Sequence, residues 1–361
     1  MTNGHHFTER EQRWRDLRFG MFIHFGLYSL LGGVWKDGLI PNGYSEQIQS
    51  HAGIPRDEYA ALARQFDPAR FDADAIAGLA VEAGMRYVVI TAKHHDGFSL
   101  FHTRQSSFNV VDASPYGRDI VLELSEACRR HGLAFGVYFS WIDWHFPHAA
   151  PMSRHNSDPI TPEHMAFNLA QVEELLTNYG PIAEVWLDMG APTVEQSRQM
   201  AEHVHRLQPD AMINGRIWND QGDFSVLGDN EVPTYRIAGP WQTPASIYKE
   251  TWGYRAWQER TDLNGKIEEC KANLREVLAR GGNYLLNIGP RGDGSVVEFE
   301  AQVLRGIGRW IEKNGGLSAC AARQNLSLSD AGGDTTVYRW TGSDYYSCKL
   351  VPCHQRNNDH S

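Results

Sequence analysis

The chain has 361 residues and a formal net charge of −10, with 44 Asp and Glu residues against 34 Lys and Arg residues. The Lys and Arg residues are scattered, whereas nucleic-acid binding needs a basic face and a polybasic membrane anchor needs clustered cations, so the composition argues against both. With 42% hydrophobic and 22% charged residues, the chain is typical of a soluble globular protein that can bury a full core. A neutral or weakly charged substrate fits this charge balance better.

Short apolar runs alternate with amphipathic helical segments along the chain. Six of these runs are predicted strands, namely Gly20–Phe25, Tyr87–Thr91, Ala134–Ser140, Glu184–Asp188, Ala211–Asn214 and Tyr284–Ile288. They are apolar almost without interruption, as expected of strands that are buried on both faces of a parallel sheet.

The helical segments carry start and stop signals. Asp72 can cap one helix, Thr161 followed by Pro162 begins another, and Thr193 with Gln196 has capping-box spacing. Apolar residues recur at helical spacing in the segments 76–83, 165–179, 200–207, 263–278 and 303–311.

The alternation of strand and helix predicts a parallel sheet covered by helices. Six clear strand–helix pairs and two ambiguous ones favour a (β/α)8 barrel over residues 1–316, with an open doubly wound sheet as the alternative. The irregular stretch from Gln221 to Tyr254 is expected to be a long loop over the mouth of the barrel. Residues 317–361 have short alternating runs, which predict a short, truncated C-terminal β appendage of one or two strands and a disordered tail.

The five cysteines are too few and too widely spread for a disulfide framework or a zinc site. Cys128 and Cys270 fall on apolar helical stripes and are expected to be buried thiols. The first eleven residues contain no apolar signal segment, and no run is long and apolar enough to span a membrane. The sequence as given therefore predicts a cytoplasmic protein.

Asp188 ends an apolar predicted strand and is followed by Met189 and Gly190. Because barrel active sites lie at the carboxyl ends of the strands, this Asp is expected to point into the catalytic mouth. The alternative, that Asp188 caps the next helix, is disfavoured because Thr193 already fills that role.

His94, His95 and Asp96 follow the predicted strand Tyr87–Thr91. A metal site is one interpretation, but adjacent residues on an extended chain point to opposite sides, and no third ligand stands at a known spacing. Hydrogen bonding to sugar hydroxyls is favoured, because a histidine can both donate and accept. His24 and Tyr138 end two other predicted strands and are expected at the same mouth.

A glycosidase that works with two carboxyl groups needs one to attack the anomeric carbon and one to protonate the leaving oxygen. Asp188 is the predicted nucleophile. The candidates for the second group are Asp223, Asp229, Glu231 and Glu250, all within the irregular stretch.

Taken together, these motifs resemble the α-L-fucosidases of glycoside hydrolase family 29. The similar segments are Phe19–Gly26, His94–Phe98, Trp186–Asp188, Arg216, Trp252–Tyr254, Gly281–Pro290 and Asp293–Gly294. The resemblance implies a retaining exo-α-L-fucosidase that acts through a covalent glycosyl-enzyme on a fucosylated oligosaccharide or glycoconjugate, with no metal or cofactor. It also implies a fucose pocket lined by His24, Glu46, His94, His95, Tyr138, Trp186 and Arg216, and Trp252 is a further candidate for substrate binding.

Phe25 stands where the family's first-strand motif usually has a Trp, and the chain departs from the family pattern at three further places. Gln47 stands where the family has a Trp after the Glu, so that an aromatic contact is missing or is supplied by Trp35. The stretch that carries the acid/base is one residue longer, and aligning it from Pro233 makes Asp229 the first candidate, with Glu231 second and Glu250 third. The family's C-terminal β-sandwich is reduced to a remnant, so either it is truncated or a partner subunit of a homo-oligomer covers that side.

Three other functions stay open at this point. The same barrel could act as an α-L-galactosidase, or it could be a non-catalytic fucose-binding protein if the altered segment 228–231 has lost the acid/base. The third is a metal-dependent hydrolase that uses His94, His95 and Asp96.

Overall fold

Eight parallel strands form one sheet in the computed structural model, which describes residues 6–320, 337–341 and 349–352. The strands are β1 (Phe19–Ile23), β4 (Tyr87–Lys93), β5 (Ala134–Ser140), β6 (Glu184–Asp188), β7 (Met212–Ile213), β8 (Ser225–Val226), β10 (Trp241–Ser246) and β11 (Asn283–Ile288). They neighbour one another in chain order, and the last strand, β11, pairs with β1. A bridge between Asn214 and Phe224 joins β7 to β8, so the sheet closes into the predicted barrel, which is confirmed.

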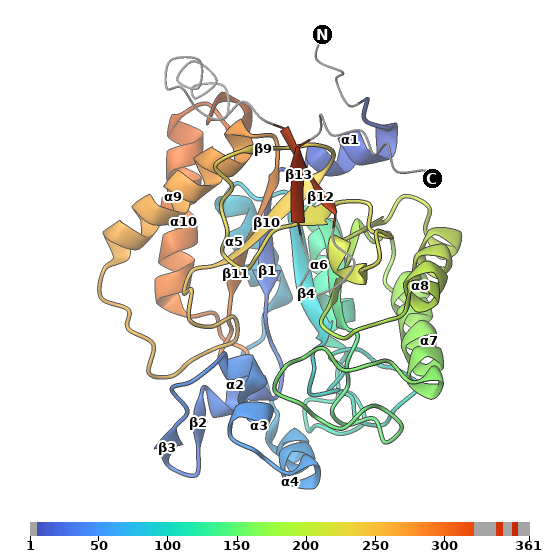
Figure 1. Ribbon diagram of the computed structural model, residues 1–361. Coiled ribbons are helices and arrows are strands. Elements are labelled where there is room, and N and C mark those ends of the chain that lie inside the picture. Colours follow the sequence, from blue (N-terminus) through green and yellow to red (C-terminus); the bar gives the residue numbers. More distant parts are fainter. Residues whose placement is uncertain (1–5, 321–336, 342–348, 353–361) are drawn as a thin grey trace, which may run out of the picture.

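Six helices surround the barrel (Figure 1). They are α5 (Ala73–Glu82), α6 (Ile120–Arg130), α7 (Pro162–Asn178), α8 (Val194–Leu207), α9 (Leu263–Ala279) and α10 (Glu298–Lys313). The segments between β7 and β8 and between β8 and β10 contain no α-helix, and all of their residues are described.

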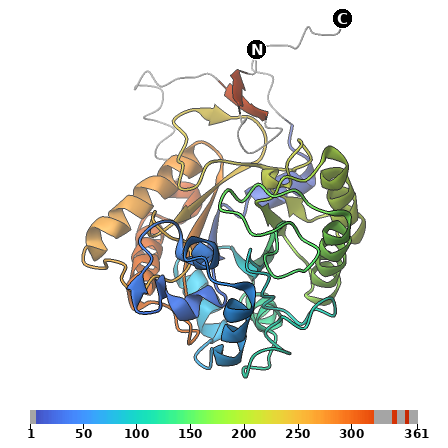
Figure 2. The ribbon, with the colours of Figure 1, turned by 60° about the horizontal axis from the view of Figure 1, so that its bottom comes forward.

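Short elements cover the two ends of the barrel. They are α1 (Glu9–Arg15), α2 (Tyr28–Leu31), α3 (Ile48–His51), α4 (Arg56–Ala60), the hairpin of β2 (Val34–Trp35) and β3 (Gly38–Leu39), and 3-10 turns at Ser45–Gln47, Ala61–Gln65 and Gly215–Ile217. Helices α2 to α4 lie at the end where β1 terminates, and α1 lies at the opposite end (Figure 1). Figure 2 turns the first of these ends towards the viewer.

The predicted helix starts are confirmed by hydrogen bonds. The Asp72 side chain accepts from the backbone N–H of Ala75, and the Thr161 side chain accepts from that of His164, with Pro162 in the first turn. Thr193 and Gln196 form both bonds of a capping box. These caps satisfy N–H groups that a helix leaves unpaired.

The prediction for Gln221 to Tyr254 is wrong in part, because this stretch contains two barrel strands, β8 and β10, as well as β9 (Arg236–Ile237). Strand β8 is only two residues long, so it leaves no pattern in the sequence. Strand β10 is fully buried, yet Gln242 and Pro244 interrupt its apolar run. The remaining residues do form irregular loops, one of which reaches the mouth of the barrel.

Two strands, β12 (Val337–Thr341) and β13 (Lys349–Pro352), are described within the predicted appendage of residues 317–361. They pair antiparallel, and β12 pairs parallel with β9, so a small sheet of order β13–β12–β9 forms at the α1 end of the molecule (Figure 1). The division at residue 316 stays a prediction. The predicted disorder of the tail concerns residues outside the described part of the chain.

Alternate residues of each strand point into the barrel. On β6 these are Glu184, Trp186 and Asp188, all of them buried. Glycines on neighbouring strands make room for large interior side chains: a Cβ at Gly136 would lie 2.9 Å from the Cγ of Glu184, and one at Gly20 would lie 2.4 Å from the ring of Tyr87. One apolar cluster lies inside the barrel, and a second and larger one lies between the barrel and its helices.

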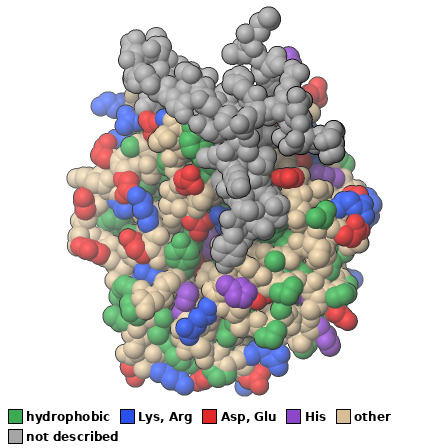
Figure 3. Space-filling view, viewed as in Figure 1, with side chains coloured by type: hydrophobic (Ala, Val, Ile, Leu, Met, Phe, Trp, Pro, Cys, Tyr) green, Lys and Arg blue, Asp and Glu red, His purple; other side chains and the backbone are tan. Residues whose placement is uncertain are grey.

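Cys128 and Cys270 are buried free thiols, as predicted, and burial raises the pKa of each to about 12. Acidic, basic and apolar side chains are interspersed over the described part of the face in Figure 3. None of the described helices is both long and apolar enough to cross a membrane.

Candidate active site

A pocket at the carboxyl ends of the barrel strands gathers most of the residues singled out in the sequence. Its lining consists of Phe22, His24, Tyr44, Glu46, Gln47, His94, His95, Tyr138, Trp186, Asp188, Met189, Arg216, Asp229 and Trp252. These side chains come from β1, β5, β6 and the loops that follow the strands. The fold thus brings together residues that are more than 200 positions apart in the chain.

Asp188 is held from two sides at the end of β6. The Tyr138 hydroxyl donates to its Oδ2 atom at 2.8 Å, and the Arg216 guanidinium donates to its Oδ1 atom at 2.8 Å. The Asp188 side chain is only 9% exposed. A buried carboxylate with an arginine and a hydroxyl as donors is fixed in position by charge-assisted hydrogen bonds.

Arg216 joins Asp188 to a second carboxylate. Its other terminal nitrogen donates to Oδ1 of Asp229 at 2.5 Å, and its guanidinium carbon lies 5.0 Å from the centre of the Trp186 ring. Burial lowers the pKa of Arg216, but attraction to Asp229 and Asp188 outweighs this effect and raises it well above the usual value. Arg216 is therefore a permanent cation between the two acids.

Asp229 lies on the loop that follows β8. Asn230 clamps this loop to β10, because its backbone N–H donates to Pro244 at 3.0 Å and its side chain accepts from the backbone N–H of Ser246 at 2.7 Å. The Asp229 side chain is 29% exposed, so it is more open to solvent than Asp188. The two carboxylates thus differ in environment, one deep and one at the rim.

The other three acids lie outside the pocket lining. Glu231 accepts from the backbone N–H of Gly228 at 3.0 Å and so turns back onto its own loop. Glu250 is exposed, and its carboxylate accepts from the Gln258 amide at 3.5 Å. Asp223 binds Arg10 at 2.6 Å and also the backbone N–H of Ile213, which ties α1 to β7. Of the four candidates, Asp229 alone shares the pocket with Asp188.

His24 has a defined tautomer. Asn287 donates its amide to the Trp252 carbonyl at 2.7 Å, so its Oδ1 atom faces Nδ1 of His24, also at 2.7 Å. The Nδ1 atom of His24 must then carry the proton, which leaves Nε2 as an acceptor. Burial lowers the pKa of His24 to about 4, so the ring is neutral near pH 7.

His95 is fixed in the same way. The Ser140 hydroxyl donates to the carbonyl of Ile142 at 2.8 Å and therefore accepts from Nδ1 of His95 at 2.7 Å. Burial lowers the pKa of His95 to about 3, and burial with the neighbouring His95 and His24 lowers that of His94 well below its usual value. Nδ1 of His94 is buried without a hydrogen-bond partner. The pocket therefore presents neutral imidazoles, and one polar atom in it is unsatisfied.

Glu46 reaches the pocket from the 3-10 turn after β3. It accepts from the backbone N–H groups of Trp252, at 3.2 Å, and Gly253, at 2.8 Å. Burial raises the pKa of Glu46 to about 7, and these backbone hydrogen bonds oppose the rise. Near neutral pH this carboxyl can therefore both donate and accept.

Trp35 lies in the β2–β3 hairpin, half-buried, with Lys36 over its ring at 5.4 Å, and does not line the pocket. Three residues that do line it, Phe22, Tyr44 and Met189, were not predicted as site residues. Burial raises the pKa of Tyr44 to about 12. Met189 has a φ of 60°, a left-handed conformation that is uncommon for a residue other than glycine and is enriched at functional sites.

His94 and His95 belong to no metal-ligating cluster in the part of the chain that the structure describes, where no group of three or more His, Cys, Asp or Glu residues is placed to hold an ion.

A (β/α)8 barrel whose strand ends present two arginine-linked carboxylates among neutral histidines and aromatic rings has the site of a glycoside hydrolase. The comparisons with known proteins agree. The family model for α-L-fucosidase matches residues 3–316. This chain belongs to the α-L-fucosidase family.

Individual relatives cover most of the chain. Human plasma α-L-fucosidase is 30% identical over 326 residues, which are 84% of this chain and 68% of that protein. The unliganded α-L-fucosidase AlfC from Lactobacillus casei is 34% identical with a TM-score of 0.75 over 84% of this chain and 99% of its own. An α-L-fucosidase from Bacteroides thetaiotaomicron is 27% identical with a TM-score of 0.75, over 87% of this chain and 76% of its own.

Proposed function

We propose that the chain is a retaining exo-α-L-fucosidase in which Asp188 is the nucleophile and Asp229 is the acid/base. The observation that carries this proposal is the bridge of Arg216 between the two carboxylates. A retaining enzyme needs two carboxyl groups ~5–5.5 Å apart, and both acids here contact a single guanidinium.

In the first step, Oδ2 or Oδ1 of Asp188 attacks the anomeric carbon, and the bond from that carbon to the leaving oxygen breaks. Asp229 gives its proton to this oxygen, exchanging its contact with Arg216 for one with the substrate. Arg216 and Tyr138 hold the Asp188 carboxylate in the orientation needed for its attack on the anomeric carbon. The rim position of Asp229 suits this role, because the leaving group departs towards solvent.

In the second step, the Asp229 carboxylate takes a proton from water, and the water oxygen attacks the anomeric carbon of the glycosyl-enzyme. The bond from that carbon to Asp188 breaks, and the nucleophile returns to its starting state. Two inversions leave the product with the configuration of the substrate.

Sugar recognition is assigned to the neutral groups of the pocket. The Nε2 atoms of His24 and His95 are acceptors for hydroxyl groups, and the unsatisfied Nδ1 atom of His94 is available for another. Glu46 offers a carboxyl group, and the rings of Phe22, Trp186 and Trp252 give an apolar surface for the C6 methyl group of fucose. An added hydroxyl on C6, as in an α-L-galactoside, would lie against these rings without a hydrogen-bond partner, which makes the binding free energy less favourable.

The solved relatives support a proposal for the substrate class. A variant of the Lactobacillus casei enzyme was solved with 4-nitrophenyl α-L-fucopyranoside and also with fucose α(1,6)-linked to N-acetylglucosamine. We propose a fucosylated oligosaccharide or glycoconjugate of this kind for the present chain. Its cytoplasmic location and its assembly as a homo-oligomer stay predictions.

The proposal is tested by hydrolysis of 4-nitrophenyl α-L-fucopyranoside, followed by proton NMR of the sugar within the first seconds. A retaining enzyme releases α-L-fucose first, and the β anomer appears only by mutarotation. Early release of β-L-fucose would contradict the retaining mechanism. Faster turnover of the 4-nitrophenyl α-L-galactoside than of the fucoside would contradict the assignment of fucose as the preferred sugar. Asp188→Ala should abolish turnover, and added azide should partly restore it and give β-L-fucosyl azide.

A further inference from the structure

A chain of hydrogen bonds runs through the barrel interior from its floor to the pocket. The indole N–H of Trp14, on α1, donates to Glu184 at 2.7 Å. The Gln242 amide donates to both Glu184 oxygens at 3.1 Å, and its carbonyl accepts from the indole N–H of Trp186 at 2.8 Å. All four side chains are at most 3% exposed.

The donors and acceptors of this chain allow one arrangement. An indole N–H can only donate, so the Gln242 atom that faces Trp186 must be its carbonyl oxygen. The Gln242 amide must therefore turn its oxygen to Trp186 and its nitrogen to Glu184, where the Tyr87 hydroxyl accepts its remaining hydrogen at 3.1 Å. Glu184 thus holds the Gln242 amide from its nitrogen side, and Gln242 holds the Trp186 ring through its carbonyl oxygen.

Trp186 in turn supports both groups that hold the nucleophile. The Arg216 guanidinium lies over its ring at 5.0 Å, and the Tyr138 ring stacks on it at 5.8 Å with an interplanar angle of 18°. Tyr138 and Arg216 are the two donors to Asp188. A tilt of the indole would therefore move both donors at once.

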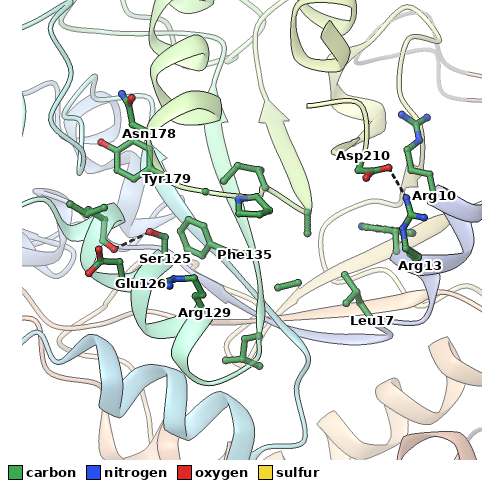
Figure 4. Close-up of a pocket in the computed structure, with 18 residues that line it drawn as sticks. Arg10, Arg13, Leu17, Ser125, Glu126, Arg129, Phe135, Asn178, Tyr179 and Asp210 are labelled. Atoms are coloured by element: carbon green, nitrogen blue, oxygen red, sulfur yellow. Dashed lines mark hydrogen bonds and ion pairs between the residues drawn. The ribbon is translucent and has the colours of Figure 1, made fainter. Parts of the chain in front are cut away.

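The floor end of the chain depends on the hydrogen bond of Trp14 to Glu184. The Trp14 ring stacks on Phe224 at 4.2 Å, but on another side it borders a cavity of about 600 Å³. Figure 4 shows this cavity, with Arg10, Arg13 and Leu17 on one side and Ser125, Arg129 and Phe135 on the other. Packing around the Trp14 indole is thus incomplete on one side. The position of this ring therefore depends more on the hydrogen bond from its N–H to Glu184 than it would in a fully packed site.

We propose that Glu184 and Gln242, which do not line the pocket, are positioning residues that fix Trp186 and through it Arg216 and Tyr138 around Asp188. The catalytic consequence rests on the function proposed above, whereas the hydrogen-bond chain itself does not. Misplacing catalytic groups by ~1 Å can cost about a hundredfold in rate, so the expected effect is on turnover.

The experiment exchanges the carboxylate and the amide. Glu184→Gln places an amide donor against the Gln242 amide, and Gln242→Glu places two carboxylates together; each disturbs the acceptor for Trp186. In the double variant, the carboxylate at position 242 accepts from Trp186 and the amide at position 184 accepts from Trp14, while the Tyr87 hydroxyl donates to position 242 instead of accepting, so every contact can be kept. Gln171→Glu is the control, because Gln171 is equally buried but contacts Ser99 and Thr103 outside the barrel interior.

Two readouts are taken on folded protein, with the folded fraction checked by near-ultraviolet circular dichroism. We expect kcat for 4-nitrophenyl α-L-fucopyranoside to fall about tenfold to a hundredfold in each single variant, with KM changed by less than about threefold. The double variant should recover to within about threefold of the parent, and Gln171→Glu should not lower kcat. The second readout is the Trp186 indole N–H signal in a nitrogen-15 spectrum, assigned by its loss in Trp186→Phe, which should shift in the single variants and return in the double variant.

Single variants that fold and keep the parent kcat would overturn the proposal, as would a double variant that folds but recovers neither kcat nor the indole signal. If the parent protein does not hydrolyse the fucoside, the proposed function fails. The indole signal then still tests the hydrogen-bond chain, so the two failures are distinguishable.

Discussion

Arg216 carries the geometry of the active site at the scale of single residues. Its two terminal nitrogens bind different carboxylates, which a planar guanidinium can do and a lysine ammonium cannot do in the same fixed geometry. The relative position of Asp188 and Asp229 therefore depends on this one side chain.

Arg216→Lys should lower kcat by about a hundredfold, because the charge stays but one of the two carboxylates loses its partner. Steady-state kinetics on 4-nitrophenyl α-L-fucopyranoside measures the effect. Arg198→Lys is the matched control, since Arg198 also binds two carboxylates, Glu195 and Glu202, but on the exposed face of α8. Equal kinetics for the two variants would contradict the role of Arg216.

Asp229→Asn should reduce the hydrolysis of a natural fucoside far more than that of the 4-nitrophenyl fucoside. The natural leaving group needs a proton, whereas nitrophenolate leaves without one, and general acid catalysis contributes typically 10²–10⁴-fold. The comparison of kcat/KM on the two substrates measures this. Glu231→Gln should leave the ratio of the two unchanged; if it changes the ratio and Asp229→Asn does not, the assignment moves to Glu231.

Glu46 predicts a pH dependence of stability. Its pKa is raised from 4.5 to about 7 in the folded protein, so the folded state holds the proton more tightly than the unfolded state. The stability that this contributes is present below pH 4.5 and is lost as the pH rises towards 7. A shift of this size corresponds to about 3 kcal/mol.

Urea unfolding of the parent and of Glu46→Gln at pH 4.5 and at pH 7.5 checks this dependence. The unfolding free energy of the parent relative to the variant should fall between the two pH values, since the variant lacks the titrating group. A difference that does not change with pH would show that Glu46 does not titrate in this window.

At the scale of elements, the capping box of α8 follows the strand that ends in Asp188, so it fixes where the chain turns after the nucleophile. Thr193→Ala removes the side-chain acceptor for the Gln196 backbone N–H and should cost about 1 kcal/mol of unfolding free energy. Denaturant unfolding measures this. Thr177→Ala near the exposed end of α7 is the control and should cost less; an equal cost would mean that the cap contributes nothing specific.

The elements that could be predicted from sequence are those whose buried positions are occupied by apolar residues. The predicted strands Ala134–Ser140 and Glu184–Asp188 have the same bounds as β5 and β6, because each strand ends where its apolar run ends. Strand β10 could not be found, because its inward positions serve a polar network through Gln242 and its middle holds Pro244. Its burial comes from tertiary structure and leaves no period in the sequence.

The pocket residues also fall into two groups, those at the ends of apolar strands and those on segments without a periodic pattern. Asp188, His24 and Tyr138 stand at the ends of apolar strands, so their position at the mouth could be predicted. Tyr44 reaches the pocket from a loop with no periodic pattern, and Gln242 reaches Trp186 across 56 positions of sequence. Among the acid/base candidates, the alignment from Pro233 ranks Asp229 first, but only the folded loop around Asn230 places Asp229 in the pocket and Glu231 outside it.

At the scale of the whole molecule, the small sheet β13–β12–β9 joins the far end of the chain to the segment between β8 and β10, where a barrel usually has a helix. A variant that ends at residue 320 would leave β9 without this partner. Its melting temperature should fall by a few degrees, because a loss of 1 kcal/mol corresponds to about 2–4 °C for a large domain. Calorimetry measures this, and an unchanged melting temperature would show that the added strands do not stabilise the barrel.

The pairing of β1 with both β4 and β11 has a consequence for synthesis on the ribosome. One neighbour of β1 follows within about 70 residues, but the other, Asn283–Ile288, is among the last barrel segments to be made. At roughly 5–20 residues per second, one edge of β1 waits some tens of seconds with its backbone groups unpaired. The nascent chain therefore passes through a stage in which an apolar strand edge is open to other chains, and this stage is where dependence on chaperones should be concentrated.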